Sequence, residues 1–236
     1  MYDLLIAGGT VVDPSQGINK KLDVAVRGGS IAALAENIPP GDARRVLDAS
    51  GQLVTPGLID AHCHVYAGVQ ALGIHPDSAG VLQAVTTIND GGSAGHAVFG
   101  GFPAYVIPST RTTVMCFLHL CSTGLSAVPE LNEWDEINPD AIGATVEAYP
   151  HIIKGIKLRQ VGKLFATRGP DVIRKAREVA ARYQLPIVLH IGDPDRQVPS
   201  AVTRETVPLM EEGDILTHVY TPQQGGIFDE NHRIIP

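Results

Sequence analysis

Two histidines, His62 and His64, flank Cys63 in the stretch PGLIDAHCHVY. The stretch begins as an apolar strand, and residues two apart on an extended strand project from the same face. Both imidazoles can therefore reach one metal ion, while the cysteine points the other way. Two polar residues at a strand end give the same pattern without any metal, so a metal site requires further ligands.

Three more polar residues lie at or near the ends of later apolar runs. Lys157 belongs to HIIKGIKL, His190 to PIVLHI and His218 to ILTHV. The C-terminal ends of parallel strands meet at one end of an α/β barrel, where such barrels build their sites. Four histidines on three strands are difficult to explain by packing, so we interpret them as metal ligands.

Lysine is a poor metal ligand because its amine is normally protonated. If burial lowers the pKa of Lys157, the neutral amine can react with carbon dioxide to form a carbamate. A carbamate has two oxygens and can bridge two metals. Lys157 is therefore a candidate ligand in this modified form.

Apolar runs of strand length alternate with helix-like segments after Pro56, as is typical of a parallel α/β sheet or barrel. The clearest helix is GPDVIRKAREVAARYQ, in which Pro170 occupies a first helical position; residues 140–149 and 200–211 are weaker candidates. An eight-stranded barrel takes about 250 residues, so we expect only six βα units in this chain. The expected strands are residues 57–62, 85–89, 112–120, 151–158, 186–191 and 215–219.

Residues 1–55 form short strands with glycine turns, and the Gly-Gly pairs at 8–9 and 28–29 are typical of hairpins. These residues are expected to form a small β unit.

The chain has 236 residues, 44% of them hydrophobic, and a net charge of -7. This charge argues against nucleic acid or an anionic membrane surface as a partner. Asp3 and Asp13 interrupt the apolar opening, which therefore resembles neither a signal peptide nor a membrane span. Three cysteines without a C-x-x-C pair indicate reduced thiols. A cytoplasmic location is expected.

Six motifs follow one another along essentially the whole chain: LLIAGGTVVDP, LDASGQLVTPGLIDAHCHVY, VTTINDGGSAG, IKGIKLR, LHIGDP and GDILTHVY. Together they resemble the amidohydrolase superfamily, and more narrowly its dihydroorotase-like amidohydrolase/deacetylase proteins. The resemblance implies an α/β fold of the TIM-barrel metallo-hydrolase type. Residues 1–55 would be the N-terminal portion of a small β-sandwich domain, and residues 56–236 an incomplete catalytic barrel containing strands 1–6.

The resemblance also implies two divalent metal ions, usually Zn²⁺. His62 and His64 would hold the first metal, His190 and His218 the second, and Lys157 would bridge them as a carbamate. Lys154 is the competing lysine, but GIK at the strand end fits the bridging position better. A hydroxide held between the two cations would attack an amide or ester carbonyl.

The same resemblance calls for an aspartate at the end of an eighth strand, which takes the proton from the attacking water. The chain ends TPQQGGIFDENHRIIP after the sixth strand, and Asp229 and His232 lie in an expected loop. We assign the role to neither, so the catalytic base is unknown. We expect either a fragment of a longer protein or a shortened chain that binds metal without a competent base.

Four residues are weaker candidates for substrate binding. Arg159 could grip a substrate carboxylate bidentately, or form a structural ion pair. Asp90 precedes GGSAG, where the glycines either admit a substrate or make a tight turn. His119 lies near the end of its strand and could contact the substrate, or it could be an internally hydrogen-bonded histidine. Tyr66 could orient a ligand or substrate, or it could only pack.

Two hypotheses of function follow. The first is a metal-dependent, deacetylase-like or amidohydrolase-like enzyme that cleaves amide (C–N, non-peptide) or ester bonds of small molecules. Its nearest alternative is a cyclic amidase that acts on a dihydroorotate-like or hydantoin-like ring. The second is a truncated, non-catalytic amidohydrolase-like chain. The expected partner is a small-molecule substrate, and a homo-oligomer is left open.

Overall fold

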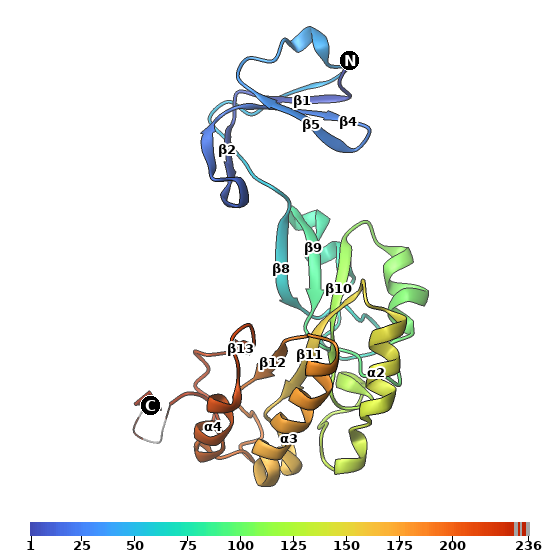
Figure 1. The fold of residues 1–236 in the computed structure, drawn as a ribbon, viewed down its shortest axis with the longest axis vertical. Coiled ribbons are helices and arrows are strands. Elements are labelled where there is room, and N and C mark those ends of the chain that lie inside the picture. The colour runs from blue at the N-terminus through green and yellow to red at the C-terminus, as the bar shows by residue number, and fades with distance from the viewer. Residues whose placement is uncertain (229–230, 232, 235–236) are drawn as a thin grey trace. The chain divides into compact units, whose positions relative to one another are not determined.

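The computed structural model describes residues 1–228, 231 and 233–234 of the chain (Figure 1). The chain divides into two compact units, Met1–Leu58 and Ile59–Pro236. No helix in the described part of the chain is long and apolar enough to cross a membrane.

The first unit contains two small sheets, one with the strand order β5-β4-β1-β6 and one with the order β3-β2-β7. A small apolar core of Val11, Leu22 and Val24 holds it together. The strands are β1 (Leu4–Ala7), β2 (Thr10–Asp13), β3 (Ile18–Lys21), β4 (Asp23–Arg27), β5 (Ser30–Ala35), β6 (Val46–Asp48) and β7 (Leu53–Val54).

Only one of the two Gly-Gly pairs makes a hairpin. Arg27 pairs with Ser30 across the β4–β5 turn, and Gly28 and Gly29 between them have φ of 59° and 77°. Two consecutive positive φ values match the twist of a two-residue hairpin, which explains the glycines. The hairpin expected at residues 8–9 is wrong, because β1 and β2 belong to different sheets.

The second unit is built on a six-stranded sheet whose spatial order, β8 to β13, follows the chain order. The strands run parallel and the sheet curls from β8 to β13 (Figure 1). The six predicted strands are thereby confirmed. Their bounds are β8 (Leu58–Cys63), β9 (Val85–Asp90), β10 (Thr113–His119), β11 (Ile153–Arg159), β12 (Ile187–His190) and β13 (Ile215–Thr217).

Three of the helices correspond to predicted segments. The first, α2 (Pro139–Ala148), is capped at its N-terminus by Asn138, whose side chain accepts a hydrogen bond from Ala141 N. The second, α3 (Gly162–Arg182), starts earlier than predicted because two helical segments join at Arg168, where the backbone is not helical; Pro170 lies in the first turn after this kink. The third, α4 (Ser200–Thr206), is shorter than expected.

Shorter helical segments complete the described structure. These are α1 (Pro76–Ala79), the π-helix η4 (Phe102–Val106), and the 3-10 helices η1 (Pro14–Gln16), η2 (Pro40–Asp42), η3 (Val81–Gln83), η5 (Ile107–Ser109), η6 (Gly124–Ser126), η7 (Trp134–Glu136) and η8 (Val207–Leu209).

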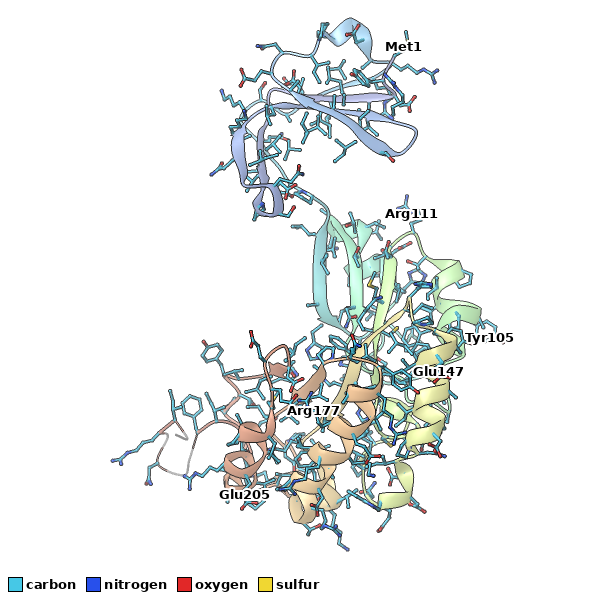
Figure 2. The ribbon with its side chains drawn as sticks, viewed as in Figure 1. Met1, Tyr105, Arg111, Glu147, Arg177 and Glu205 are labelled. Carbon is cyan, nitrogen blue, oxygen red and sulfur yellow. The ribbon has the colours of Figure 1, made fainter. Side chains whose placement is uncertain are left out.

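The main core is built on the sheet and includes residues of α2, α3 and η4. Val172, Ala176 and Val179 of α3 are fully buried, as are Ile156 of β11 and Ile187 of β12. A hydrogen bond from Tyr183 Oη to Glu147 Oε1 links the ends of α3 and α2, which lie side by side (Figures 1 and 2). This packing fixes the central strands β11 and β12, whose C-terminal ends carry Lys157 and His190.

Candidate metal centre

The candidate ligands all lie at the C-terminal end of the parallel sheet. His62 is on β8, and His64 is one residue beyond it. Lys157 is on β11, His190 is the last residue of β12, and His218 directly follows β13. The topology therefore brings together residues that are up to 156 positions apart, since this span runs from 62 to 218.

The four imidazoles form a row. Ring centroids of His64 and His62 are 5.6 Å apart, those of His62 and His218 5.2 Å, and those of His218 and His190 4.3 Å. Lys157 Nζ lies 3.4 Å from His62 Nε2. Within the described residues, no group of three or more His, Cys, Asp or Glu side chains is closed around a metal position. The rings are thus neighbours that do not converge on one point.

His218 has an unusual backbone for a non-glycine residue. Its φ of 64° lies in the left-handed region, directly after the end of β13. Such conformations are rare outside glycine and are concentrated at functional sites.

The surroundings of the histidines keep their rings neutral. Burial, and then the charge of Lys157, lowers the pKa of His62 to about 3 and that of His64 to about 4. Burial, and then Arg159, lowers the pKa of His190 to about 2. Burial also lowers the pKa of His218. A neutral imidazole is the form that binds a metal.

A hydrogen bond identifies the free nitrogen of His190. Its Nε2 lies 3.2 Å from the carbonyl oxygen of Gly192, which can only accept. Nε2 therefore carries the ring proton, and the lone pair is on Nδ1. That lone pair is free for a ligand.

Lys157 is the more deeply buried of the two candidate lysines. Only 1% of its surface is exposed, and burial, followed by the charge of Arg159, lowers its pKa to about 7. Its amine is thus neutral in a large share of molecules near neutral pH. Lys154 is exposed, and its Nζ lies 3.5 Å from Pro150 O.

A cavity of about 610 Å³ opens beside these residues. This volume lies within the range of sites for small molecules. Its polar lining residues are His64, Gln70, Glu130, Lys157, Arg159, His190, Asp195 and His218, and its apolar lining residues are Ala71, Leu72, Leu125, Val128, Pro129, Val161 and Pro194.

Glu130 holds Arg159 at the cavity wall. Arg159 Nη1 donates to Glu130 Oε1 at 2.8 Å, and the Glu130 side chain is completely buried while that of Arg159 is 18% exposed. Burial raises the pKa of Glu130, and the charge of Arg159 opposes this shift. The ion pair considered as an alternative for Arg159 is therefore present, and the guanidinium still borders the cavity.

The other three candidate substrate residues have partners inside the protein and do not line this cavity. Tyr66 Oη donates to Val98 O at 2.6 Å. His119 is fully buried, and its Nδ1 accepts from Cys121 N at 3.0 Å. Asp90 is also fully buried, and its carboxylate accepts from backbone N–H groups. We therefore assign none of the three a substrate contact.

Sequence reasoning did not find Glu130 or Ser93. Glu130 is one of several acidic residues in the loop after β10, and nothing in the sequence distinguishes it except that loops at this end of a barrel form the site. Ser93 lies in the GGSAG stretch, but its hydrogen bond to His64 joins residues 29 positions apart. Asp229 and His232, considered for the missing base, lie outside the described residues.

The chain is similar to known enzymes, to some in sequence and to others in fold. It is 32% identical to a deacetylase of Brucella anthropi over 207 residues, which is 86% of this chain and 50% of that protein. Its fold matches the crystal structure of an adenine deaminase with a TM-score of 0.84 and 27% identity, and the match covers 99% of this chain and 61% of that chain. It also matches the crystal structure of a dihydroorotase with a TM-score of 0.79 and 28% identity, over 94% of this chain and 59% of that chain. No family model matches the chain. The chain spans about half the length of the two curated deacetylases that it matches at 32% and 33% identity, although each match covers most of the chain itself.

Proposed function

We propose that this chain, which belongs to the dihydroorotase-like amidohydrolase/deacetylase group of the amidohydrolase superfamily, is a metal-dependent hydrolase of an amide or ester bond in a small molecule. One observation carries the proposal: four neutral imidazoles and a buried lysine of lowered pKa meet at one end of the sheet beside a cavity. Relatives named as deacetylases, at 32% and 33% identity, favour removal of an acyl group.

The donor set fits two divalent cations. Imidazole nitrogen is a common zinc ligand, and these rings are neutral. His62 and His64 would hold one metal, and His190 and His218 the other. When bound, such metals lower the pKa of a water molecule and polarise a carbonyl group.

Lys157 would connect the two halves of this site. A neutral amine can add carbon dioxide to form a carbamate, and the lowered pKa of about 7 makes the neutral form accessible. The carbamate would supply two oxygens where the amine supplies one nitrogen. Lys157 is buried next to His62, as a bridging group requires.

The cavity wall indicates what the substrate carries. Arg159, fixed by Glu130, would bind a carboxylate of the substrate. The apolar lining residues, which include Leu72, Leu125 and Val161, would accommodate a hydrocarbon group next to the scissile bond. We therefore propose an N-acyl or O-acyl compound with a neighbouring carboxylate. The three free cysteines favour a reducing compartment, and we propose the cytoplasm.

A cyclic amidase is the second candidate function. The match to a dihydroorotase structure favours it, together with 48% identity over 63 residues to a dihydroorotase of Geobacter metallireducens. A substrate screen distinguishes the two activities, because ring opening of a dihydroorotate-like or hydantoin-like compound yields one product and releases no separate acyl group.

Metal content and hydrolysis of the purified chain test the proposal together. Protein expressed with zinc and bicarbonate is analysed by plasma mass spectrometry and screened with N-acyl and O-acyl carboxylates. We expect about two metals per chain, and His190→Ala should lose metal and hydrolysis together. Hydrolysis that persists after the metal is lost would contradict a metal-dependent enzyme. Metal without any hydrolysis would favour the non-catalytic alternative.

A further inference from the structure

The Asp90–Ser93 loop, which begins at the last residue of β9, lies against the segment that carries His62 and His64. Gly91 N donates to Cys63 O at 2.7 Å, and Val65 N donates to Asp90 Oδ2 at 2.8 Å. These two bonds fasten the loop to the backbone on either side of His64. The loop and the two histidines therefore form one connected piece of structure.

Asp90 acts as the fixed acceptor of this loop. Its Oδ1 accepts from Gly92 N at 3.0 Å and Ser93 N at 2.6 Å, and its Oδ2 accepts from Val65 N and from Ser93 Oγ, both at 2.8 Å. The backbone N–H groups can only donate. An ionised carboxylate has about four acceptor sites, so all of them are used within the protein.

The hydroxyl of Ser93 then determines which nitrogen of His64 carries the proton. Ser93 Oγ donates its single proton to Asp90 Oδ2, so it can only accept from its other neighbours. His64 Nδ1 lies 2.9 Å from this oxygen and must be the donor. In the neutral ring the remaining lone pair is therefore on Nε2.

The two glycines of the loop leave room for two other candidate ligands. A Cβ atom on Gly91 would lie 2.2 Å from His62 Cδ2 and 2.5 Å from His62 Nε2. A Cβ atom on Gly92, whose φ is +96°, would lie 2.3 Å from Lys157 Cγ. Any larger residue would displace these side chains, so the glycines allow His62 and Lys157 to occupy their positions.

We propose that the Asp90–Ser93 loop is a positioning element for the metal ligands, in which Ser93 holds His64 with Nε2 free and the glycines admit His62 and Lys157. The inference rests on the proposed function only in taking these three side chains as ligands. Asp90, expected to contact substrate, acts instead through Ser93. A hydrogen bond to the second nitrogen of a ligating histidine fixes the tautomer and orientation of the ring.

The tautomer of His64 gives a test that needs no metal and no substrate. The metal-free full chain, labelled with ¹⁵N-histidine, is examined by two-bond ¹⁵N–¹H correlation spectra near pH 7, with His64→Gln to assign the signals. We expect the Nδ1–H form of His64 in the parent chain and loss of its predominance in Ser93→Ala. Ser109→Ala is the matched control, because that hydroxyl bonds to Val106 O and not to a candidate ligand.

Zinc affinity, measured by competition with a chromophoric chelator, is the second readout. We expect Ser93→Ala to weaken zinc binding by about 10-fold to 100-fold, and Ser109→Ala to leave it unchanged. An unchanged His64 tautomer together with unchanged zinc affinity in Ser93→Ala would overturn the inference. Should Ser93→Ala not fold, Ser93→Cys provides the same test, because a thiol is a weak donor and acceptor. A parent chain that binds no zinc refutes the proposed function, whereas the tautomer still decides the role of Ser93.

Discussion

Lys157 Nζ lies 3.4 Å from His62 Nε2, although the two residues are 95 positions apart in the chain. The contact places Lys157 beside His62 of the first histidine pair, and His62 in turn neighbours His218 of the second pair. It makes Lys157 the residue on which assembly of two metals should depend.

Lys157→Ala should therefore reduce the metal content from about two per chain to one or fewer. A small carboxylate such as propionate should restore part of the loss, because it brings two oxygens into the space that a carbamate would fill. The measurement is plasma mass spectrometry with and without propionate. Lys154→Ala is the matched control, since this exposed lysine lies three residues away. Full metal content in Lys157→Ala would exclude a bridging role.

Gly91→Ala tests the space around His62 without a change of charge. The added methyl group would lie 2.2 Å from His62 Cδ2, so the imidazole must move. We expect zinc affinity to fall by about tenfold or more, while overpacking typically costs about 1–3 kcal/mol of stability. Gly100→Ala is the control, because nothing lies within 4 Å of a Cβ atom there. Equal zinc affinities in the two variants would show that zinc binding does not require a residue as small as glycine at position 91.

Removal of the charge on Glu130 tests how Arg159 is held. Glu130→Gln keeps the size of the side chain but weakens the 2.8 Å bond to Arg159 Nη1. A hydrogen bond to a charged group contributes about 1.5–3 kcal/mol, so we expect about a 10-fold to 100-fold loss in kcat/KM, mainly through KM. The loss should be confined to substrates that carry a carboxylate. An equal loss with the corresponding neutral amide would contradict carboxylate binding by Arg159.

Asp77 should make stability depend on pH in the acidic range. Its carboxylate accepts from the hydroxyls of Thr110 and Thr112 and from the backbone N–H groups of Arg111 and Thr112, and these bonds lower its pKa. Because the folded-state pKa is lower than the unfolded one, the stabilisation is present above the unfolded value of 3.8 and is lost as the pH falls through the folded value.

Asp77→Asn should accordingly lower the melting temperature at pH 7, and the difference from the parent chain should shrink as the pH falls below 3.8. Thermal melts of the metal-free parent chain and of metal-free Asp77→Asn, recorded from pH 7 to below pH 3.8, measure this difference. A gap that is independent of pH would show that the carboxylate charge contributes nothing.

Local sequence patterns were sufficient to predict the strands and the five candidate ligands. Apolar runs of the right length predict the strands, and a polar residue at the end of each run is visible without any structure. His62, Lys157, His190 and His218 then meet because parallel strands in sequential order place equivalent ends at one edge of a sheet. That these side chains bind metal remains a prediction.

The partners of these side chains were decided by tertiary structure alone. Asp90 looked like a substrate ligand, but folding buries it and directs its four hydrogen bonds to Val65, Gly92 and Ser93. Arg159 acquires Glu130 from a loop 29 positions away. The sequence contains no periodicity that encodes such contacts. A hydrogen bond requires a donor–acceptor distance within a few tenths of an ångström of about 2.9 Å, and packing sets that distance. The sequence thus determined which five candidate ligands stand at one end of the sheet, and the fold determined what holds them there.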